Sequence, residues 1–286
     1  MAKRTVVLTG ASGYIAQRML AELQARYDLV LLDARPTTRD GKAVSGVRLV
    51  DLTDSNRDTY RQHFAGADAV VHCAFVNAPG MSLANALENS DLKFHAEHAN
   101  VSMAYNVYRT ALEEGVRRVV VASSNHAADF YERLIWADKW DGVTPEMLPL
   151  SDNFYGWAKS AYELLGFVFA TGHGMPRPLE VVQIRIGGPR DTADLDRCRP
   201  GEIKKMHRGL GAYLSRRDQA QLFIKSIEAP NIQNEYGVPF QIFYGVSGNT
   251  HGFWSIVNAR RVIGYAPEDD SQVNFAQQIA ELSRKG

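Results

Sequence analysis

A tyrosine and a lysine, four residues apart, are the side chains in this sequence best suited to acid–base chemistry. Tyr155 and Lys159 fall on one face of any helix that contains them. A free tyrosine titrates near pH 10, so a tyrosine base at neutral pH needs its pKa lowered by roughly 3 units, about 4 kcal/mol. The Lys159 ammonium can supply part of that stabilisation. The same spacing also occurs where a tyrosine is only a core ring, so other residues must decide between the two interpretations.

Two serines stand where a ligand-binding edge is expected. Ser123 and Ser124 end the apolar run Val119–Ala122. Ligands of parallel sheets bind at the carboxyl ends of the strands. The serines are therefore candidates to share a site with Tyr155 and Lys159.

A glycine turn near the amino end is typical of nucleotide binding. Gly10 and Gly13 directly follow the apolar run Thr5–Thr9, so they permit a tight turn and the close approach of a pyrophosphate to a helix. Asp33 ends the second apolar run roughly 20 residues later, where it can accept hydrogen bonds from an adenosine ribose and repel a 2′-phosphate. NAD is therefore predicted over NADP. Arg35 keeps NADP open as the less favoured cofactor, because a guanidinium there can hold the phosphate.

The elements that must position these groups alternate between short apolar strands and longer amphipathic helices. Strands are predicted at Thr5–Thr9, Leu29–Leu32, Val47–Val50, Ala69–Val71 and Val119–Val121. Helices are predicted between them at Ile15–Tyr27, Arg57–Phe64 and Leu92–Glu114. Nearly continuous apolar strands indicate a sheet covered on both faces. The fold class is α/β, a Rossmann-type doubly wound parallel sheet with a small C-terminal substrate lobe.

The second half is less regular. It carries a long loop with two tryptophans, and from Gly187 onward a loop rich in Arg, Asp and Pro. Further elements are expected at about Asn153–Ala170 (helix), Val181–Ile186 (strand), Asp218–Glu228 (helix), Phe240–Tyr244 (strand), Trp254–Val262 (helix) and Val273–Ser283 (helix). We expect residues 1–186 to form an NAD-binding domain that includes the catalytic residues. Residues 187–286 are expected to form a small substrate-binding lobe, continuous with the first domain.

Composition excludes several classes of protein. The 286 residues contain 32 Lys and Arg and 32 Asp and Glu, so there is no bulk charge to attract nucleic acid or an acidic membrane. Two cysteines cannot form a disulfide framework, and the eight histidines lack metal-ligand spacing, so no metal is expected. No uninterrupted apolar stretch of about 18 residues exists, and the first apolar run is too short for a signal peptide. A cytoplasmic enzyme with a small-molecule substrate is predicted.

Taken together, the glycine turn, Asp33, the strand-end serines and the Tyr/Lys pair resemble the extended short-chain dehydrogenase/reductase superfamily of NAD-dependent epimerases and dehydratases. The resemblance implies that Tyr155 is the catalytic base or acid, that Lys159 orients the nicotinamide ribose and lowers the tyrosine pKa, and that Ser124 hydrogen-bonds the reacting oxygen. The cofactor contacts that it implies are Gly10, Gly13, Tyr14, Ile15, Asp33, Arg35, Asp51, Leu52, Cys73, Ala74, Tyr155, Lys159 and Ile186.

Within that superfamily the chain is most similar to uronate dehydrogenases and archaeal NAD-dependent glucose 6-phosphate dehydrogenases. Ser124 is followed by Asn125 and His126 rather than by the acidic pair of sugar-nucleotide dehydratases. The substrate contacts implied by the resemblance are Asn77, Ser124, Asn125, His126, Tyr155, Gly188 and Arg208. Asn77 and Gly188 stand where those relatives carry serines, so the identity of the substrate stays open.

The predicted reaction is oxidation of the anomeric carbon of an acidic hexose to an aldonolactone, with a hexuronate as the first choice and a phosphorylated sugar, a sulfonated sugar or a neutral aldose next. Arg208 would bind the anionic end, because a guanidinium suits a carboxylate through two parallel hydrogen bonds and suits a phosphate nearly as well. Arg208 can instead belong to a solvated basic face, and His126 can be an ordinary loop histidine. The alternatives are a nucleotide-sugar 4-epimerase with tightly bound NAD and a non-catalytic NAD-binding protein. A homodimer is implied by the resemblance alone.

Overall fold

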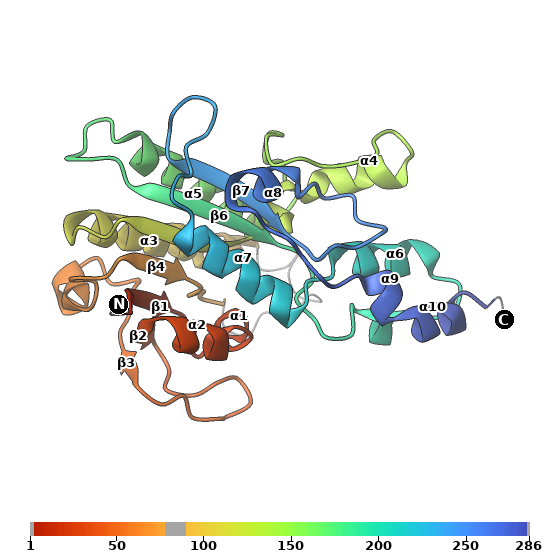
Figure 1. Ribbon diagram of the computed structural model, residues 1–286, viewed down its shortest axis with the longest axis horizontal. Coiled ribbons are helices and arrows are strands. Elements are labelled where there is room, and N and C mark those ends of the chain that lie inside the picture. The colour runs from red at the N-terminus through yellow and green to blue at the C-terminus, as the bar shows by residue number, and fades with distance from the viewer. Residues whose placement is uncertain (1–2, 78–89, 285–286) are drawn as a thin grey trace.

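A parallel seven-stranded sheet forms the centre of the computed structural model, which describes residues 3–77 and 90–284 (Figure 1). Its strand order is β3-β2-β1-β4-β5-β6-β7. The strands are β1 (Thr5–Thr9), β2 (Asp28–Asp33), β3 (Val47–Leu49), β4 (Ala69–His72), β5 (Arg118–Ser124), β6 (Glu180–Ile186) and β7 (Phe240–Gly245). The order reverses between β1 and β4, which opens a crevice at the carboxyl ends of these strands. The predicted doubly wound sheet is confirmed.

Helices cover both faces of the sheet. The helical elements are α1 (Tyr14–Gln17), α2 (Leu20–Arg26), η1 (Arg57–Thr59), η2 (Arg61–His63), α3 (Ser90–Glu113), η4 (Asn125–Tyr131), α4 (Glu132–Trp136), α5 (Phe154–Thr171), η5 (Leu195–Arg197), α6 (Ile203–Ala212), α7 (Arg216–Glu228), α8 (Val257–Ile263), α9 (Ser271–Asn274) and α10 (Ala276–Leu282). Val6 and Leu8 pack in a core with α2, α7 and α8, whereas Val7 packs with α3 and α5. Burial on both faces explains why the strands are continuously apolar.

A third apolar cluster lies away from the sheet. It joins α6 to the segment before it and to the C-terminal helices, and its buried members are Ala193, Leu195, Met206, Leu210, Tyr213 and Phe275. Figure 1 shows α6, α9 and α10 gathered at one end of the molecule. In contrast β7, which also follows residue 187, pairs with β6 in the sheet.

Several helix predictions were wrong in detail. The single helix expected over Ile15–Tyr27 is two helices, α1 and α2, separated at Arg18 and Met19. Arg18 is buried there and donates hydrogen bonds to Asp191 and to the Leu214 carbonyl, so a tertiary contact overrides the helical pattern. The helix expected over Arg57–Phe64 is a pair of 3₁₀ turns.

The irregular second half holds more helix than predicted. The loop expected after Gly187 contains α6, and the long loop after Ser124 contains η4 and α4. The helix expected at Trp254–Val262 begins later, at Val257, and the last predicted helix is divided into α9 and α10. None of the described helices is long and apolar enough to cross a bilayer.

Candidate active site

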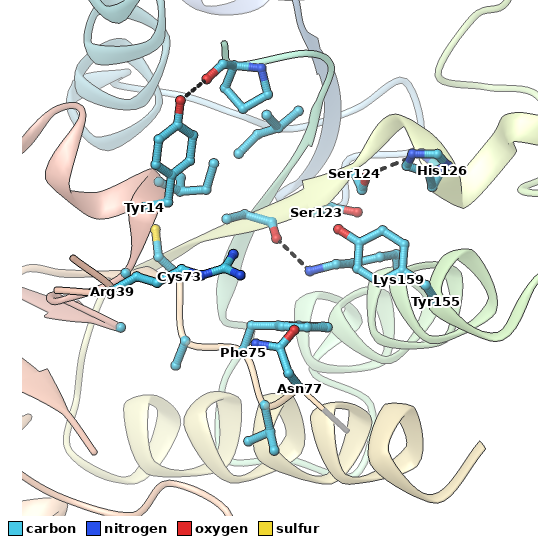
Figure 2. A pocket seen from close by; sticks show the side chains of 18 of the residues that line it. Tyr14, Arg39, Cys73, Phe75, Asn77, Ser123, Ser124, His126, Tyr155 and Lys159 are labelled. Atoms are coloured by element: carbon cyan, nitrogen blue, oxygen red, sulfur yellow. Dashed lines mark hydrogen bonds between the residues drawn. The ribbon is translucent and has the colours of Figure 1, made fainter. Parts of the chain in front are cut away.

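A cavity of about 840 Å³ occupies the crevice at the carboxyl ends of the central strands. Every residue that the sequence analysis assigned to catalysis, cofactor or substrate lines it: Gly10, Gly13, Tyr14, Ile15, Asp33, Arg35, Asp51, Leu52, Cys73, Ala74, Asn77, Ser124, Asn125, His126, Tyr155, Lys159, Ile186, Gly188 and Arg208. Figure 2 shows Ser124, Tyr155 and Lys159 together on one side, with Tyr14 and Arg39 across the cavity. The fold therefore brings the predicted residues to one place, from positions spread over most of the chain.

The glycine turn leaves no room for a side chain at its first position. Gly10 has a φ of +66°, which is the left-handed region that favours glycine. A methyl group on Gly10 would lie 2.5 Å from the backbone nitrogen of Ala74. The missing side chain lets the backbone after β4 lie directly against the turn at the end of β1. Such a backbone cradle fits the close approach of a dinucleotide pyrophosphate.

Asp33 is fixed by backbone groups on both sides. Its two carboxylate oxygens accept hydrogen bonds from the backbone N–H groups of Ser12 (2.9 Å) and Arg35 (2.9 Å). The Ser12 hydroxyl also donates to the Arg35 carbonyl at 2.8 Å, which ties the glycine turn to the end of β2. A carboxylate has about four acceptor sites, so Asp33 can still accept from a ribose hydroxyl.

Other predicted cofactor contacts form the walls of this end. Tyr14 donates its hydroxyl to the Pro189 carbonyl at 2.8 Å and so joins α1 to the segment after β6 (Figure 2). Asp51 accepts from the Thr53 N–H at 2.9 Å, which leaves its second oxygen without a recorded partner among the described residues. Asp33 and Asp51 thus offer acceptors for the hydroxyl and amino groups of an adenosine moiety, and this end of the cavity fits NAD.

A close approach of two segments sets the position of Tyr155. Tyr155 lies in the first turn of α5, and Asn153 begins this helix by accepting a hydrogen bond from the Gly156 N–H at 3.0 Å. A methyl group on Gly156 would lie 2.1 Å from the carbonyl oxygen of His126. Glycine at this position therefore lets α5 pack against the segment after β5. That packing places Tyr155 beside Ser124, whose side chain hydrogen-bonds with the phenol.

Ser124 and Lys159 are held by hydrogen bonds to backbone groups. The Ser124 Oγ accepts from the His126 N–H at 3.2 Å. Lys159 is buried, its Nζ donates to the Ala122 carbonyl at 3.1 Å, and the Nζ lies 5.5 Å from the centre of the Tyr155 ring (Figure 2). Ala122 and Ser124 both lie at the end of β5, so this strand end positions Ser124, Tyr155 and Lys159 together.

The pKa of Tyr155 differs from the prediction. Burial raises it above the usual value, although the hydrogen bond with Ser124 lowers it, and the Glu97 carboxylate raises it further. Burial also lowers the pKa of Lys159 from 10.5 to about 8, because a charged ammonium is poorly solvated there. In the chain alone, desolvation therefore outweighs the stabilisation of phenolate that we expected from Lys159.

His126 and Asn125 lie beyond Ser124 in η4. Asn125 is buried, and the Nδ1 of His126 lies 2.8 Å from Oδ2 of Asp129, which also accepts from Asn153 at 2.9 Å. Burial alone would raise the pKa of Asp129, but the hydrogen bonds from its neighbours, His126 foremost, hold it below its usual value. The carboxylate orients the ring and favours a proton on Nδ1. Asp129 thus fixes the orientation of the His126 ring at the cavity, and a contact of His126 with substrate stays a prediction.

The guanidinium of Arg208 is paired with a carboxylate, so Arg208 is not part of a solvated basic face. On α6, its Nε and Nη2 donate to the two oxygens of Glu132 at 2.6 and 2.9 Å. Glu132 is buried and begins α4. Lys204 and Lys205, by contrast, are exposed. The bidentate pair leaves Arg208 in the cavity wall, with a carboxylate already bound to it.

Three predicted contacts have a limited chemical role. Gly188 offers no hydroxyl, and its backbone N–H donates to the carbonyl of Ala212, the last residue of α6, at 2.6 Å. Asn77 is exposed at the cavity rim. Burial raises the pKa of the Cys73 thiol to about 12, so it stays protonated and lines the cavity as a small apolar group.

The sequence analysis missed several lining residues. Arg39 reaches the cavity from the loop after β2, and Arg190, Asp194 and Arg197 line it from the loop after β6. Glu132 and Trp136 line a side chamber of about 420 Å³ that shares His126 and Arg208 with the main cavity. Arg39, Arg190 and Asp194 lie in loops, Arg197 in η5, and Glu132 and Trp136 in α4. All of them fall in segments that the sequence predicted as loops, where no periodic pattern marks a functional residue. In the described ranges no group of three potential metal ligands occurs.

Comparisons with known proteins agree with this geometry. The model of the NAD dependent epimerase/dehydratase family matches residues 6–207. An NAD-dependent glucose-6-phosphate dehydrogenase of Haloferax volcanii is 32% identical over 93% of this chain and 94% of its own length. An L-arabinose 1-dehydrogenase (NAD(P)(+)) of the same organism is 29% identical over 93% of this chain and 97% of its own. The solved structure of a mutated uronate dehydrogenase has a similar fold, with a TM-score of 0.71 and 23% identity over 100% of this chain and 88% of its own.

Proposed function

This chain belongs to the NAD dependent epimerase/dehydratase family and is an NAD-dependent oxidoreductase, and within that family we propose that it is a sugar 1-dehydrogenase. It would oxidise the anomeric carbon of a free sugar to an aldonolactone. The observation that carries the proposal is the meeting of Ser124, Tyr155 and Lys159 with the Gly10 turn and Asp33 in one cavity. The names of the two Haloferax relatives, both sugar dehydrogenases, support the same reaction class.

The residues divide the reaction between them. When bound, oxidised NAD supplies the acceptor for the hydride and a second positive charge. Tyr155 accepts the proton of the anomeric hydroxyl, and Ser124 holds that oxygen by a hydrogen bond. Lys159 stays fixed by the Ala122 carbonyl and favours the deprotonated phenol. The sugar carbon loses a hydride and its hydroxyl loses a proton, so a lactone remains.

The cofactor would be held mainly by the amino-terminal half. Gly10 and Gly13 give room for the pyrophosphate, Asp33 accepts from the adenosine ribose, and Asp51 and Leu52 line the adenine side. The remaining contacts that we propose are Tyr14, Ile15, Arg35, Cys73, Ala74, Tyr155, Lys159 and Ile186.

Two classes of sugar are candidates for the substrate. An acidic hexose, such as a hexuronate or a phosphorylated or sulfonated sugar, is supported by Arg208 in the cavity wall. A neutral aldose is supported by the carboxylate of Glu132, which already binds that guanidinium. In both cases Asn125 and His126 would contact ring hydroxyls, with Asn77 and Gly188 at the edge of the sugar.

Two further assignments accompany this function. The substrate lobe of residues 187–286 would act through α6, α9 and α10, which share an apolar cluster of their own.

A second copy of the chain is the partner favoured by α3 and α5, because these helices expose large apolar side chains. They are Leu92, Tyr105, Phe154, Trp157, Leu164, Phe167 and Val168. Sedimentation equilibrium at micromolar concentration tests the pairing, and a monomer would contradict it.

The test is formation of NADH, followed by absorbance, with purified protein, NAD and a panel of neutral and acidic sugars. We expect Tyr155→Phe to lower kcat at least a hundredfold, because the variant cannot take the proton. Its affinity for NAD should remain within a fewfold. Tyr236→Phe is the matched control, since Tyr236 is exposed and does not line the cavity.

The alternatives give different results in the same assay. A 4-epimerase with bound NAD would interconvert a nucleotide sugar without net NADH formation. A non-catalytic protein would bind NAD and show no turnover with any substrate. Sugar-dependent NADH formation that survives in Tyr155→Phe would refute the assigned mechanism and leave the dehydrogenase activity standing.

A further inference from the structure

The side chamber beside the proposed reaction centre holds more carboxylates than guanidinium groups. Its lining consists of His126, Asp129, Glu132, Arg133, Trp136, Asp152 and Arg208. This set contains three carboxylates, two guanidinium groups and one imidazole. The chamber lies next to the main cavity, which also holds Ser124 and Tyr155, because His126 and Arg208 line both spaces. The end of a sugar remote from its anomeric carbon would meet this surface.

Each cation in the chamber already has its own acid. Glu132 binds Arg208 through both oxygens, and Asp152 forms an ion pair with Arg133. The Nδ1 of His126 faces Asp129 at 2.8 Å. A bidentate guanidinium–carboxylate pair uses the planar fork that would otherwise recognise a carboxylate on a substrate. An incoming anion would therefore meet compensated cations and an unbalanced carboxylate.

The free hydrogen-bonding capacity suits hydroxyl groups instead. The Nη1 of Arg208 has no hydrogen-bond partner among the described residues and can donate to a sugar oxygen. The oxygens of Glu132 have lone pairs left to accept from a hydroxyl. With its proton on Nδ1, the neutral ring of His126 presents Nε2 as an acceptor. A hydroxyl can both donate and accept, whereas a carboxylate or phosphate can only accept.

Gly188 adds to this pattern. It has no side-chain donor, and both of its backbone groups are already used: its N–H donates to the Ala212 carbonyl at the end of α6, and its carbonyl accepts from the Leu214 N–H. It offers nothing to replace the hydrogen bonds that an anionic group would need on this side.

We propose that Glu132 is a specificity-determining residue that selects against an anionic group, so that the sugar oxidised here is an uncharged aldose. The inference rests on the proposed sugar 1-dehydrogenase activity. Glu132 acts through Arg208: it neutralises the guanidinium and repels a carboxylate or phosphate on the sugar. The acidic hexose predicted from Arg208 alone is then the weaker substrate.

The experiment compares kcat and KM for NAD reduction with two groups of sugars. The neutral probes are D-glucose, D-galactose and L-arabinose, and the anionic probes are D-glucuronate, D-galacturonate and glucose 6-phosphate. For the wild-type chain we expect kcat/KM of the best neutral sugar to exceed that of the best anionic sugar at least tenfold. A smaller ratio, or a preference for an anion, would overturn the proposal without any variant.

Glu132→Gln keeps the size of the side chain and removes its charge. We expect it to raise kcat/KM for the best anionic sugar at least tenfold, through KM and with kcat for that sugar within threefold, and to lower the ratio of neutral to anionic kcat/KM by at least the same factor. This separation of KM from kcat and of anionic from neutral sugars would not follow from a general loss of structure. Glu132→Ala serves as the second variant, with the same expected direction.

Asp152→Asn is the matched control, because it removes one carboxylate of the same chamber that binds Arg133 and not Arg208. Its ratio of neutral to anionic activity should stay within threefold of wild type. An equal shift in Asp152→Asn would mean that the total charge of the chamber decides, and would overturn the role of Glu132. If the wild-type chain oxidises sugars but Glu132→Gln leaves kcat/KM for the anionic sugars unchanged, the role of Glu132 is refuted and the proposed dehydrogenase activity stands. No NADH from any sugar, with NAD still bound, overturns the proposed function together with it.

Discussion

The two ends of the cavity are built by different means. At the cofactor end, backbone groups set the geometry: Gly10 accommodates the close approach of Ala74, and Asp33 accepts from two backbone N–H groups. At the substrate end, pairs of side chains set it, namely Arg208 with Glu132 and His126 with Asp129. A backbone-built surface changes little with sequence, whereas a surface made of side-chain pairs can change with one substitution.

The two ends also differ in how their cations are paired. Arg35 and Arg39 line the cofactor end, and among the described residues neither forms an ion pair. Arg208 and Arg133 at the substrate end each bind a carboxylate. The cofactor end thus keeps guanidinium groups available to a phosphate-bearing ligand, while those of the side chamber are bound to carboxylates. Substitutions at the two ends should therefore have different consequences.

The largest effect is expected where the backbone has no freedom. Gly10→Ala puts a methyl group 2.5 Å from the Ala74 nitrogen and holds alanine at a φ of +66°. We expect NAD affinity to fall at least a hundredfold and the free energy of unfolding to fall by about 3 kcal/mol. Equilibrium titration with NAD and urea unfolding measure the two effects.

Gly46→Ala separates backbone strain from steric overlap. Gly46 has a similar φ of +79°, but a methyl group there would have no atom within 4 Å. It should cost about 1 kcal/mol of stability and leave NAD affinity within twofold. If Gly10→Ala bound NAD as well as Gly46→Ala does, the cofactor end would not depend on this close approach.

A change of charge at the cofactor end should alter the choice of cofactor. Asp33→Asn removes the carboxylate that repels a 2′-phosphate and leaves Arg35 and Arg39 to attract it. We expect the ratio of kcat/KM for NADP to that for NAD to rise about thirtyfold, about 2 kcal/mol. Steady-state kinetics with both cofactors measure the ratio.

Asp28→Asn is the control for this change, because Asp28 is an exposed residue at the opposite end of the same strand. It should leave the ratio unchanged. A variant Asp33→Asn that lost both cofactors equally would show that Asp33 acts only by holding the turn through Ser12 and Arg35.

Much of the fold was predictable because burial on both faces makes the strands continuously apolar. The errors fall where a tertiary contact competes with local pattern. Arg18 interrupts a helical sequence because it is buried against Asp191 and Gln219. The helix α6 was missed because its glycines lower helix propensity. Gly209 is nevertheless required there, since a methyl group would lie 2.3 Å from the Ala193 carbonyl oxygen.

The two ends of the site also differ in how far they could be predicted. Gly10 and Asp33 follow a spacing that a strand–turn–helix unit imposes, so their meeting in one cavity could be expected from local sequence. The partner of Arg208 is 76 residues away, on a helix within a predicted loop, and no local pattern points to it. Residue types at the substrate end were predicted, but their charge balance depends on pairings that only the fold creates.

Lys159 lies between the two ends of the cavity. Its titration can therefore show whether backbone contacts or charge pairs determine its environment. Its Nζ donates to a backbone carbonyl, as groups at the cofactor end do, and the Glu97 and Glu163 carboxylates oppose the effect of burial. Burial prevails, and the pKa of Lys159 falls from 10.5 to about 8. Between these two values the unfolded chain binds more protons than the folded chain, so stability should rise with pH in that window.

The smallest effect that we expect is the contribution of Lys159 to the pH dependence of the free energy of unfolding. From pH 7 to pH 9 the lysine should add about 1.4 kcal/mol to the free energy of unfolding of the ligand-free chain. Lys159→Met should lack this increment, while the contributions of the tyrosines and of Cys73 remain the same in both proteins. The difference between the two in urea unfolding at each pH isolates the lysine. Equal slopes would mean that the carboxylates compensate Lys159 fully, and that the reaction centre is built from charge pairs, as the substrate end is.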